Sequence, residues 1–194
     1  MRGKLWINSF VKSLIKLEDE SDVKTDTEWT GFMGKVINEV GKETNCYVAM
    51  LNKVSEEDEY SGEYLNIDAF FIDNREYENW NTEDWDPPVL PSAVVELENA
   101  YDNEKITYCL WKVLCIRAPV RVLICYQGRT DAIEKLRKHL EGVIWQGSLM
   151  KGTEGDLLVI IGDDSKGGES EWSEYFNVFE WRNDRLERIE SLEW

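Results

Sequence analysis

The apolar positions at the start of the chain recur at helical spacing. In residues 5–17, and again in residues 28–43, apolar side chains fall three or four positions apart. This period predicts two amphipathic helices. The polar residues 18–27 connect them, and positions 25–27 carry side chains suited to cap the second helix.

Short apolar runs typical of strands follow the second helix. We expect strands at residues 46–54, 64–72 and 92–99, then a helix over about 104–117. Residues 120–127 form an apolar, β-rich run typical of a strand covered on both faces. The step from the third strand through this helix to the fourth predicts a right-handed parallel crossover.

The last third of the chain repeats the alternation and closes with a hairpin. A helix is expected at 130–141 and a strand at 156–162. Strands at 175–181 and 186–189 should pair across a turn at Asn183-Asp184.

Together these elements predict one α/β domain over residues 1–194, with a mixed central sheet flanked by helices. We divide it into an N-terminal helical extension (1–27), a core (28–127) and a sheet extension (128–194). The turn-rich stretch 73–91 is expected to be a lid or recognition loop.

Three carboxylates stand in or at the end of two of the apolar strands. Asp68 interrupts one strand, and Glu96 and Glu98 lie near the end of the next. A buried charge without a partner is costly, so their placement indicates a shared cation. Glu96 and Glu98 lie two positions apart and should therefore point to the same face.

Such a cluster suits phosphodiester chemistry. Asp68 and Glu96 offer the oxygen ligands that Mg²⁺ prefers, and the ion would stabilise charge in the transition state. A cleaving site also needs a positive or proton-handling group. Lys112 or Lys105, on the helix that follows, could reach the same space.

Charge bears on the partners of the chain. The net charge of −17 repels nucleic acid at long range. Residues 105–139 are the exception, because eight Lys or Arg stand there against Asp131 and Glu134, a local balance of +6. A DNA partner is therefore less favoured but not excluded.

Zinc hydrolysis and triad catalysis lack the residues that they need. His139 is the single histidine, and it is expected to be an exposed residue of a basic helix. The four cysteines show no paired zinc spacing and are expected to be buried thiols of a cytoplasmic protein: Cys46, Cys109, Cys115 and Cys125.

The basic residues 1–17 raise the question of a membrane. Lys12 and Lys16 interrupt the apolar stretch and no cleavage site follows, so we do not interpret it as a signal peptide. No run of about 18 uncharged apolar residues exists that would span a bilayer. We expect this helix to pack on the domain or on a second subunit, and expect no membrane partner.

Residues 28–127 resemble the PD-(D/E)xK nuclease superfamily, which has the restriction-endonuclease-like fold. The resemblance rests on the helix–strand–strand–strand–helix–strand order, on Ile67-Asp68 in the second strand and on the run Val94–Asn99 in the third. Trp111-Lys112 and the strand 120–127 complete it.

The resemblance implies a Mg²⁺- or Mn²⁺-dependent nuclease that hydrolyses phosphodiester bonds in DNA. It implies Asp68 and Glu96 as metal ligands, with Glu39 on the first core helix as an auxiliary acid. The sequence departs from the family at the third catalytic position, where Glu98 stands in place of Lys. Either Glu98 acts there, as in some restriction enzymes, or Lys112 supplies the lysine from the helix, or the chemistry has been lost.

The alternative is a catalytically inactive protein of the same fold that serves as an acidic interaction module for a protein partner or a second copy. The acidity of the chain, the missing lysine and the expected exposure of Trp80 and Trp85 favour it.

The acids also have non-catalytic explanations. Asp68 could pair with Arg75 or Arg121, and Glu96 and Glu98 could form a solvated face. The case for a shared cation fails only if both of these explanations are true at once.

Overall fold

Seven strands form one mixed sheet whose spatial order follows the chain from β1 to β7. The computed structural model describes residues 2–20, 25–50, 67–79, 89–166 and 171–194. The strands are β1 (Cys46–Met50), β2 (Ala69–Asp73), β3 (Ala93–Glu98), β4 (Val120–Gln127), β5 (Asp156–Asp163), β6 (Phe176–Arg182) and β7 (Arg185–Arg188). The three central strands β3, β4 and β5 are parallel, and the other neighbouring pairs are antiparallel.

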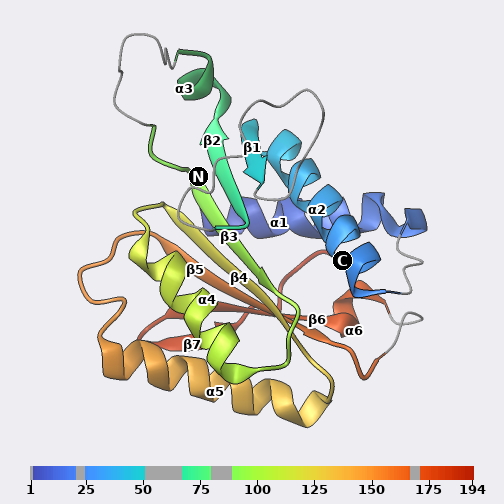
Figure 1. Ribbon diagram of the computed structural model, residues 1–194, viewed down its shortest axis with the longest axis vertical. Coiled ribbons are helices and arrows are strands. Elements are labelled where there is room, and N and C mark those ends of the chain that lie inside the picture. The colour runs from blue at the N-terminus through green and yellow to red at the C-terminus, as the bar shows by residue number, and fades with distance from the viewer. Residues whose placement is uncertain (1, 21–24, 51–66, 80–88, 167–170) are drawn as a thin grey trace.

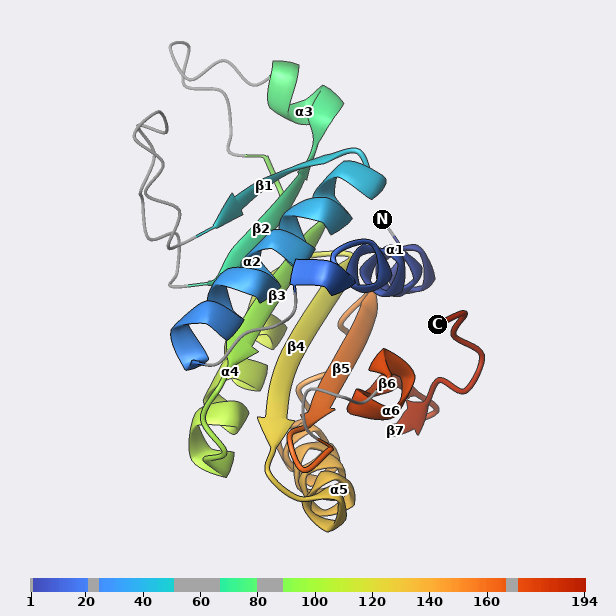
Figure 2. The same cartoon turned by 90° about the vertical axis from the view of Figure 1, so that its right-hand side faces the viewer.

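Helices cover both faces of this sheet, as the sequence predicts (Figures 1 and 2). The longer helices are α1 (Gly3–Lys16), α2 (Asp26–Glu43), α4 (Asn103–Cys115) and α5 (Thr130–Gly147). The short ones are η1 (Glu18–Glu20), α3 (Asn74–Asn79) and α6 (Trp172–Tyr175). The first two long helices pack on one face and the other two on the opposite face, so the sheet separates two apolar cores.

The N-terminal helix belongs to the core of the domain. Trp6, Phe10 and Leu14 of α1 are fully buried, and Trp6 stacks on Phe10 with ring centroids 5.5 Å apart. The expected packing on the domain is confirmed. No helix within the described ranges combines the length and the apolar character needed to cross a membrane.

Caps and turns explain where several elements begin and end. Thr25 and Glu28 form a capping box at the start of α2, which confirms the cap expected at 25–27. Asn183 and Asp184 both have positive φ, as the tight turn of the β6–β7 hairpin requires. Ser148, with φ 50°, ends α5 in the left-handed conformation.

Some boundaries differ from the expectation. α5 continues to Gly147 because Ile144 extends the buried stripe of its earlier turns. Part of the expected loop 73–91 is the helix α3, while residues 80–88, with Trp80 and Trp85, lie outside the described residues. Three cysteines are buried as expected, but Cys115, on the outer side of α4, is exposed.

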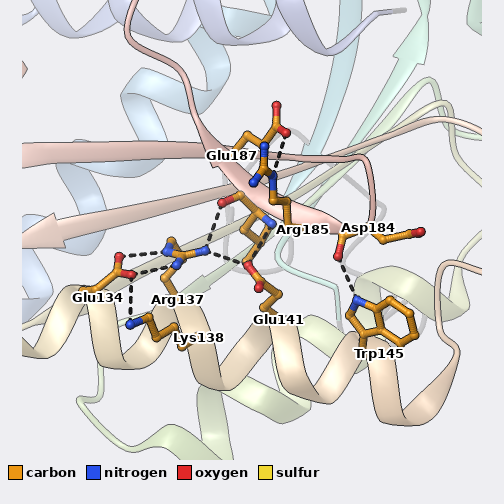
Figure 3. Close-up of polar contacts among 9 residues, drawn as sticks. Glu134, Arg137, Lys138, Glu141, Trp145, Asp184, Arg185 and Glu187 are labelled. Carbon is orange, nitrogen blue, oxygen red and sulfur yellow. Dashed lines mark hydrogen bonds and ion pairs between the residues drawn. The ribbon is translucent and has the colours of Figure 1, made fainter.

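Side chains of α5 occupy the open edge of β7 (Figure 3). Arg137 donates to the backbone carbonyl of Leu186 at 3.1 Å and also bonds the carboxylates of Glu134 and Glu141. The backbone N–H of Leu186 donates to Glu141 at 3.1 Å. Because β7 is an edge strand, these contacts satisfy main-chain groups that would otherwise be open to another strand.

Replacing Arg137 by Met should destabilise the protein by about 1–2 kcal/mol, since it removes the donor of the Leu186 carbonyl, both hydrogen bonds to Glu134 and one of the two donors of Glu141. Urea unfolding would measure the loss. The control is Arg185→Met at the same edge, because Arg185 is exposed and bonds only its neighbour Glu187 among the described residues. Equal losses in both variants would contradict the role given to Arg137.

Candidate functional site

Three acidic side chains lie on the sheet face that α4 covers. Along β3 the side chains alternate, so that Val94 packs with the α4 core and Val95 with the opposite core. Glu96 and Glu98 follow Val94 at intervals of two and point toward α4, where each contacts a helix residue. The expectation that these two glutamates share a face is confirmed.

Glu96 is the most deeply buried of them. It is 1% exposed, and its Oε2 lies 2.6 Å from Nζ of Lys112. Lys112 lies three positions after Cys109, at the border of the buried stripe of α4, so its side chain runs beneath the helix toward the sheet. The second oxygen of Glu96, Oε1, is buried and has no hydrogen-bond partner among the described residues.

Asp68 immediately precedes β2, whereas the sequence placed it within the strand. Its Oδ2 accepts a hydrogen bond of 2.7 Å from the backbone N–H of Leu97. This bond continues the β2–β3 pairing, which ends at Ala69 and Val95, by one side-chain contact. Asp68 is therefore fixed next to Glu96.

The arginine partners considered for Asp68 have other contacts. Arg121 donates to the backbone carbonyls of Ile116 and Glu154, and Arg75 lies 3.5 Å from the carboxylate of Asp73. The solvated-face explanation fails for Glu96, which is buried.

The pKa values follow from this burial. Burial, with the charge of Asp68 added, raises the pKa of Glu96 to about 7, against the lowering effect of Lys112. The pKa of Asp68 is also raised, mainly by burial. Burial alone would lower the pKa of Lys112, but the hydrogen bond and charge of Glu96 outweigh it and raise that pKa. A protonated Lys112 thus faces a carboxyl group that titrates near neutrality.

Glu98 makes a different set of contacts. Its Oε1 accepts from the backbone N–H of Ala100 at 2.8 Å, and its Oε2 lies 3.8 Å from Sγ of Cys109. Cys109 was not foreseen as a neighbour of the acids, although its spacing of three from Lys112 indicates a shared helix face. Burial raises the pKa of the Cys109 thiol, so it is a neutral neighbour.

Glu39 does not join this group. It lies on α2, which packs on the opposite face of the sheet, and it is held by Lys16 and, at 2.9 Å, by Lys42. The sequence located Glu39 near the end of the helix correctly but could not show which face of the sheet the helix covers. The structure therefore places Glu39 apart from Asp68 and Glu96.

The positions of the acidic side chains limit how many of them could bind one metal ion. Within the described ranges, no three His, Cys, Asp or Glu side chains are grouped so as to hold a metal ion. Asp68 and Glu96 remain as a pair, and the buried Oε1 of Glu96, which has no partner in the part of the chain that the structure describes, fits a cation. Mg²⁺ commonly uses only one or two carboxylates, with water and phosphate as the other ligands.

No family model, curated protein or solved structure matches the chain. These comparisons therefore assign the chain to no family.

The raised pKa of Glu96 predicts a pH-dependent stability. Its folded pKa of about 7 exceeds its ordinary value of 4.5, so the folded state favours the protonated form. The stabilisation that comes from protonated Glu96 is full below pH 4.5. As the pH rises from 4.5 through 7 this stabilisation is lost, and the free energy of unfolding falls by roughly 3 kcal/mol. Glu96→Gln should flatten this fall in the free energy of unfolding, as measured by urea titration at several pH values.

The matched control is Glu174→Gln, at an exposed position of α6. It should keep the wild-type profile. A Glu96→Gln variant whose stability falls between pH 4.5 and 7 as steeply as the wild type would contradict the assignment.

Proposed function

We propose that the protein is a divalent-metal-dependent nuclease-like hydrolase of the PD-(D/E)xK type, which cleaves phosphodiester bonds in DNA. The main support is the contact between Lys112 and the buried Glu96, beside Asp68. A buried carboxylate is costly to the fold when one of its oxygens has no hydrogen-bond partner, as is true of Glu96 Oε1 within the described ranges. A role of that oxygen in metal binding would explain why the chain keeps a glutamate at this buried position.

The order of the elements supports the same proposal. α2, β1, β2, β3, α4 and β4 follow the helix–strand–strand–strand–helix–strand order implied by the resemblance. Asp68 stands at the start of β2 and Glu96 within β3, the two positions where that family has its acids.

In this proposal Lys112 takes the place of the missing motif lysine. It reaches the carboxylate of Glu96 from α4, while Glu98 stands at the usual lysine position and bonds Ala100 and Cys109. Lys112 would hold a positive charge beside the scissile phosphate and fix the rotamer of Glu96. Glu98 would position the end of β3.

Asp68 and Glu96 would hold the Mg²⁺ or Mn²⁺ ion. When bound, the ion would supply charge stabilisation and lower the pKa of a ligated water. Glu96 releases its proton near neutral pH, since its pKa is about 7. Its Oε1, which makes no hydrogen bond among the described residues, would then bind the ion, while Oε2 contacts Lys112. Lys112 stays protonated over the same range because Glu96 raises its pKa.

A second candidate is an interaction protein that has kept the fold without the activity. The observation that favours it is an exposed aromatic pair on α4, Tyr108 and Trp111, which stack with ring centroids 5.8 Å apart. With a net charge of −17, such a surface suits a protein partner or a second copy better than DNA. This candidate predicts no stabilisation by metal.

Plasmid cleavage with Mg²⁺ or Mn²⁺ tests the first candidate. Asp68→Asn, Glu96→Gln and Lys112→Met should each lower the rate by at least about 100-fold, because each removes a charge from the reacting centre. Lys135→Met is the control, since Lys135 is exposed on α5 and pairs with Asp131. Equal cleavage by the wild type and the three site variants would reject the assignment.

Thermal melting separates the two candidates without an activity assay. Millimolar Mg²⁺ or Mn²⁺ should raise the melting midpoint of the wild type, because a ligand bound only by the folded state stabilises it. Glu96→Gln should abolish the rise. A wild-type midpoint that does not respond to either ion would favour the interaction protein.

A further inference from the structure

A hollow lies where the end of α4 meets the turn that precedes β5. Its volume is about 420 Å³, within the usual range of small-molecule sites. Arg117 and Arg121 line it from one side, and Gly152 and Glu154 from the other. It shares no residue with the Asp68–Glu96 pair.

Arg121 is a buried cation at this hollow. It is 2% exposed, and its Nε and Nη1 donate to the backbone carbonyls of Ile116, at 2.9 Å, and Glu154, at 3.0 Å. Among the described residues it has no carboxylate partner, and its remaining nitrogen, Nη2, makes no hydrogen bond there. Nη2 is not among the buried atoms without a partner, so it is open to the hollow or to solvent.

The carbonyl bonds explain only part of this arrangement. They tie the end of α4 to the turn before β5, and the carbonyl dipoles at the end of the helix partly offset the charge. However, burying a guanidinium without a counter-charge is costly when a neutral side chain could fill the space. An anionic ligand would supply the missing counter-charge.

A second arginine strengthens the positive charge of the hollow. Arg117 is exposed and, within the described part of the chain, forms no ion pair, although the chain has 39 acidic residues against 22 basic ones. By contrast, Lys135, Arg137 and Lys138 of α5 each pair with a carboxylate. The hollow therefore holds two arginines against the single carboxylate of Glu154.

We infer that this hollow binds a phosphate group, as inorganic phosphate or as the phosphomonoester of a small metabolite. Guanidinium donors match the oxygens of phosphate, and two arginines complement its double charge better than the single charge of a carboxylate. Arg121 anchors the ligand from the buried end, and Arg117 closes over it from the surface. Gly152, which lines the hollow, has open space where a side chain would stand.

Thermal melting at constant ionic strength tests this inference in a phosphate-free buffer. Inorganic phosphate, a nucleoside monophosphate and acetate are titrated separately, each against chloride. The wild type should show a saturable rise in midpoint with phosphate or the monophosphate, and little with acetate. The stronger of the two phosphate responses identifies the free ion or the monoester as the ligand.

Arg117→Gln should weaken the apparent affinity by about tenfold or more, because it removes one charged hydrogen-bond donor. Arg121→Met should remove the response, and Arg117→Gln decides the outcome should Arg121→Met fail to fold. Lys12→Gln, at an exposed position of α1, controls for the loss of one positive charge and should respond as the wild type does.

Glu96→Gln should also keep the phosphate response, which separates this site from the proposed metal site. The inference is overturned by the absence of a saturable phosphate response, by an unchanged response in Arg117→Gln, or by an equal response to acetate. Loss of the response in Glu96→Gln would overturn it as well, since phosphate would then be acting at the other site.

Discussion

The ion pair between Glu96 and Lys112 joins the middle of the sheet to α4, the helix that covers it. Each partner depends on the other, because either charge left alone at this depth would be costly. Asp68 adds a second carboxylate through its bond to the N–H of Leu97. The pair therefore links α4 to β3 beside their apolar contacts, and Lys112 and Asp68 both affect the pKa of Glu96.

The two faces of the sheet differ in the side chains that they bury. The face under α1 and α2 is filled by large apolar side chains, among them Trp6, Phe10 and Phe71. The face under α4 contains two buried charges on neighbouring strands, Glu96 on β3 and Arg121 on β4. Both Glu96, in the candidate site, and Arg121, at the proposed phosphate site, therefore lie on the face of the sheet that α4 covers.

The sequence was sufficient for the long helices and the strands but not for the short helices, and it drew attention to the acids and to Lys112. Periodicity located the long helices and the central strands, and Lys112 could be proposed because it follows the acids on the next helix. The separation of Glu39 from Asp68 and Glu96 could not be foreseen, because spacing along a helix cannot show which face of a sheet the helix covers. The bond from Asp68 to Leu97 and the hollow at Arg121 depend on tertiary contacts between segments distant in the chain, which no local pattern encodes.

An NMR titration of the Glu96 side-chain carboxyl, with and without Mg²⁺, would test the central claim most directly. We expect a pKa of about 7 for the metal-free protein, and a clear fall when Mg²⁺ is added, because a bound cation favours the ionised carboxylate. A pKa at the ordinary value for glutamate, unchanged by the ion, would show that the Glu96–Lys112 pair is neither buried as described nor a metal site.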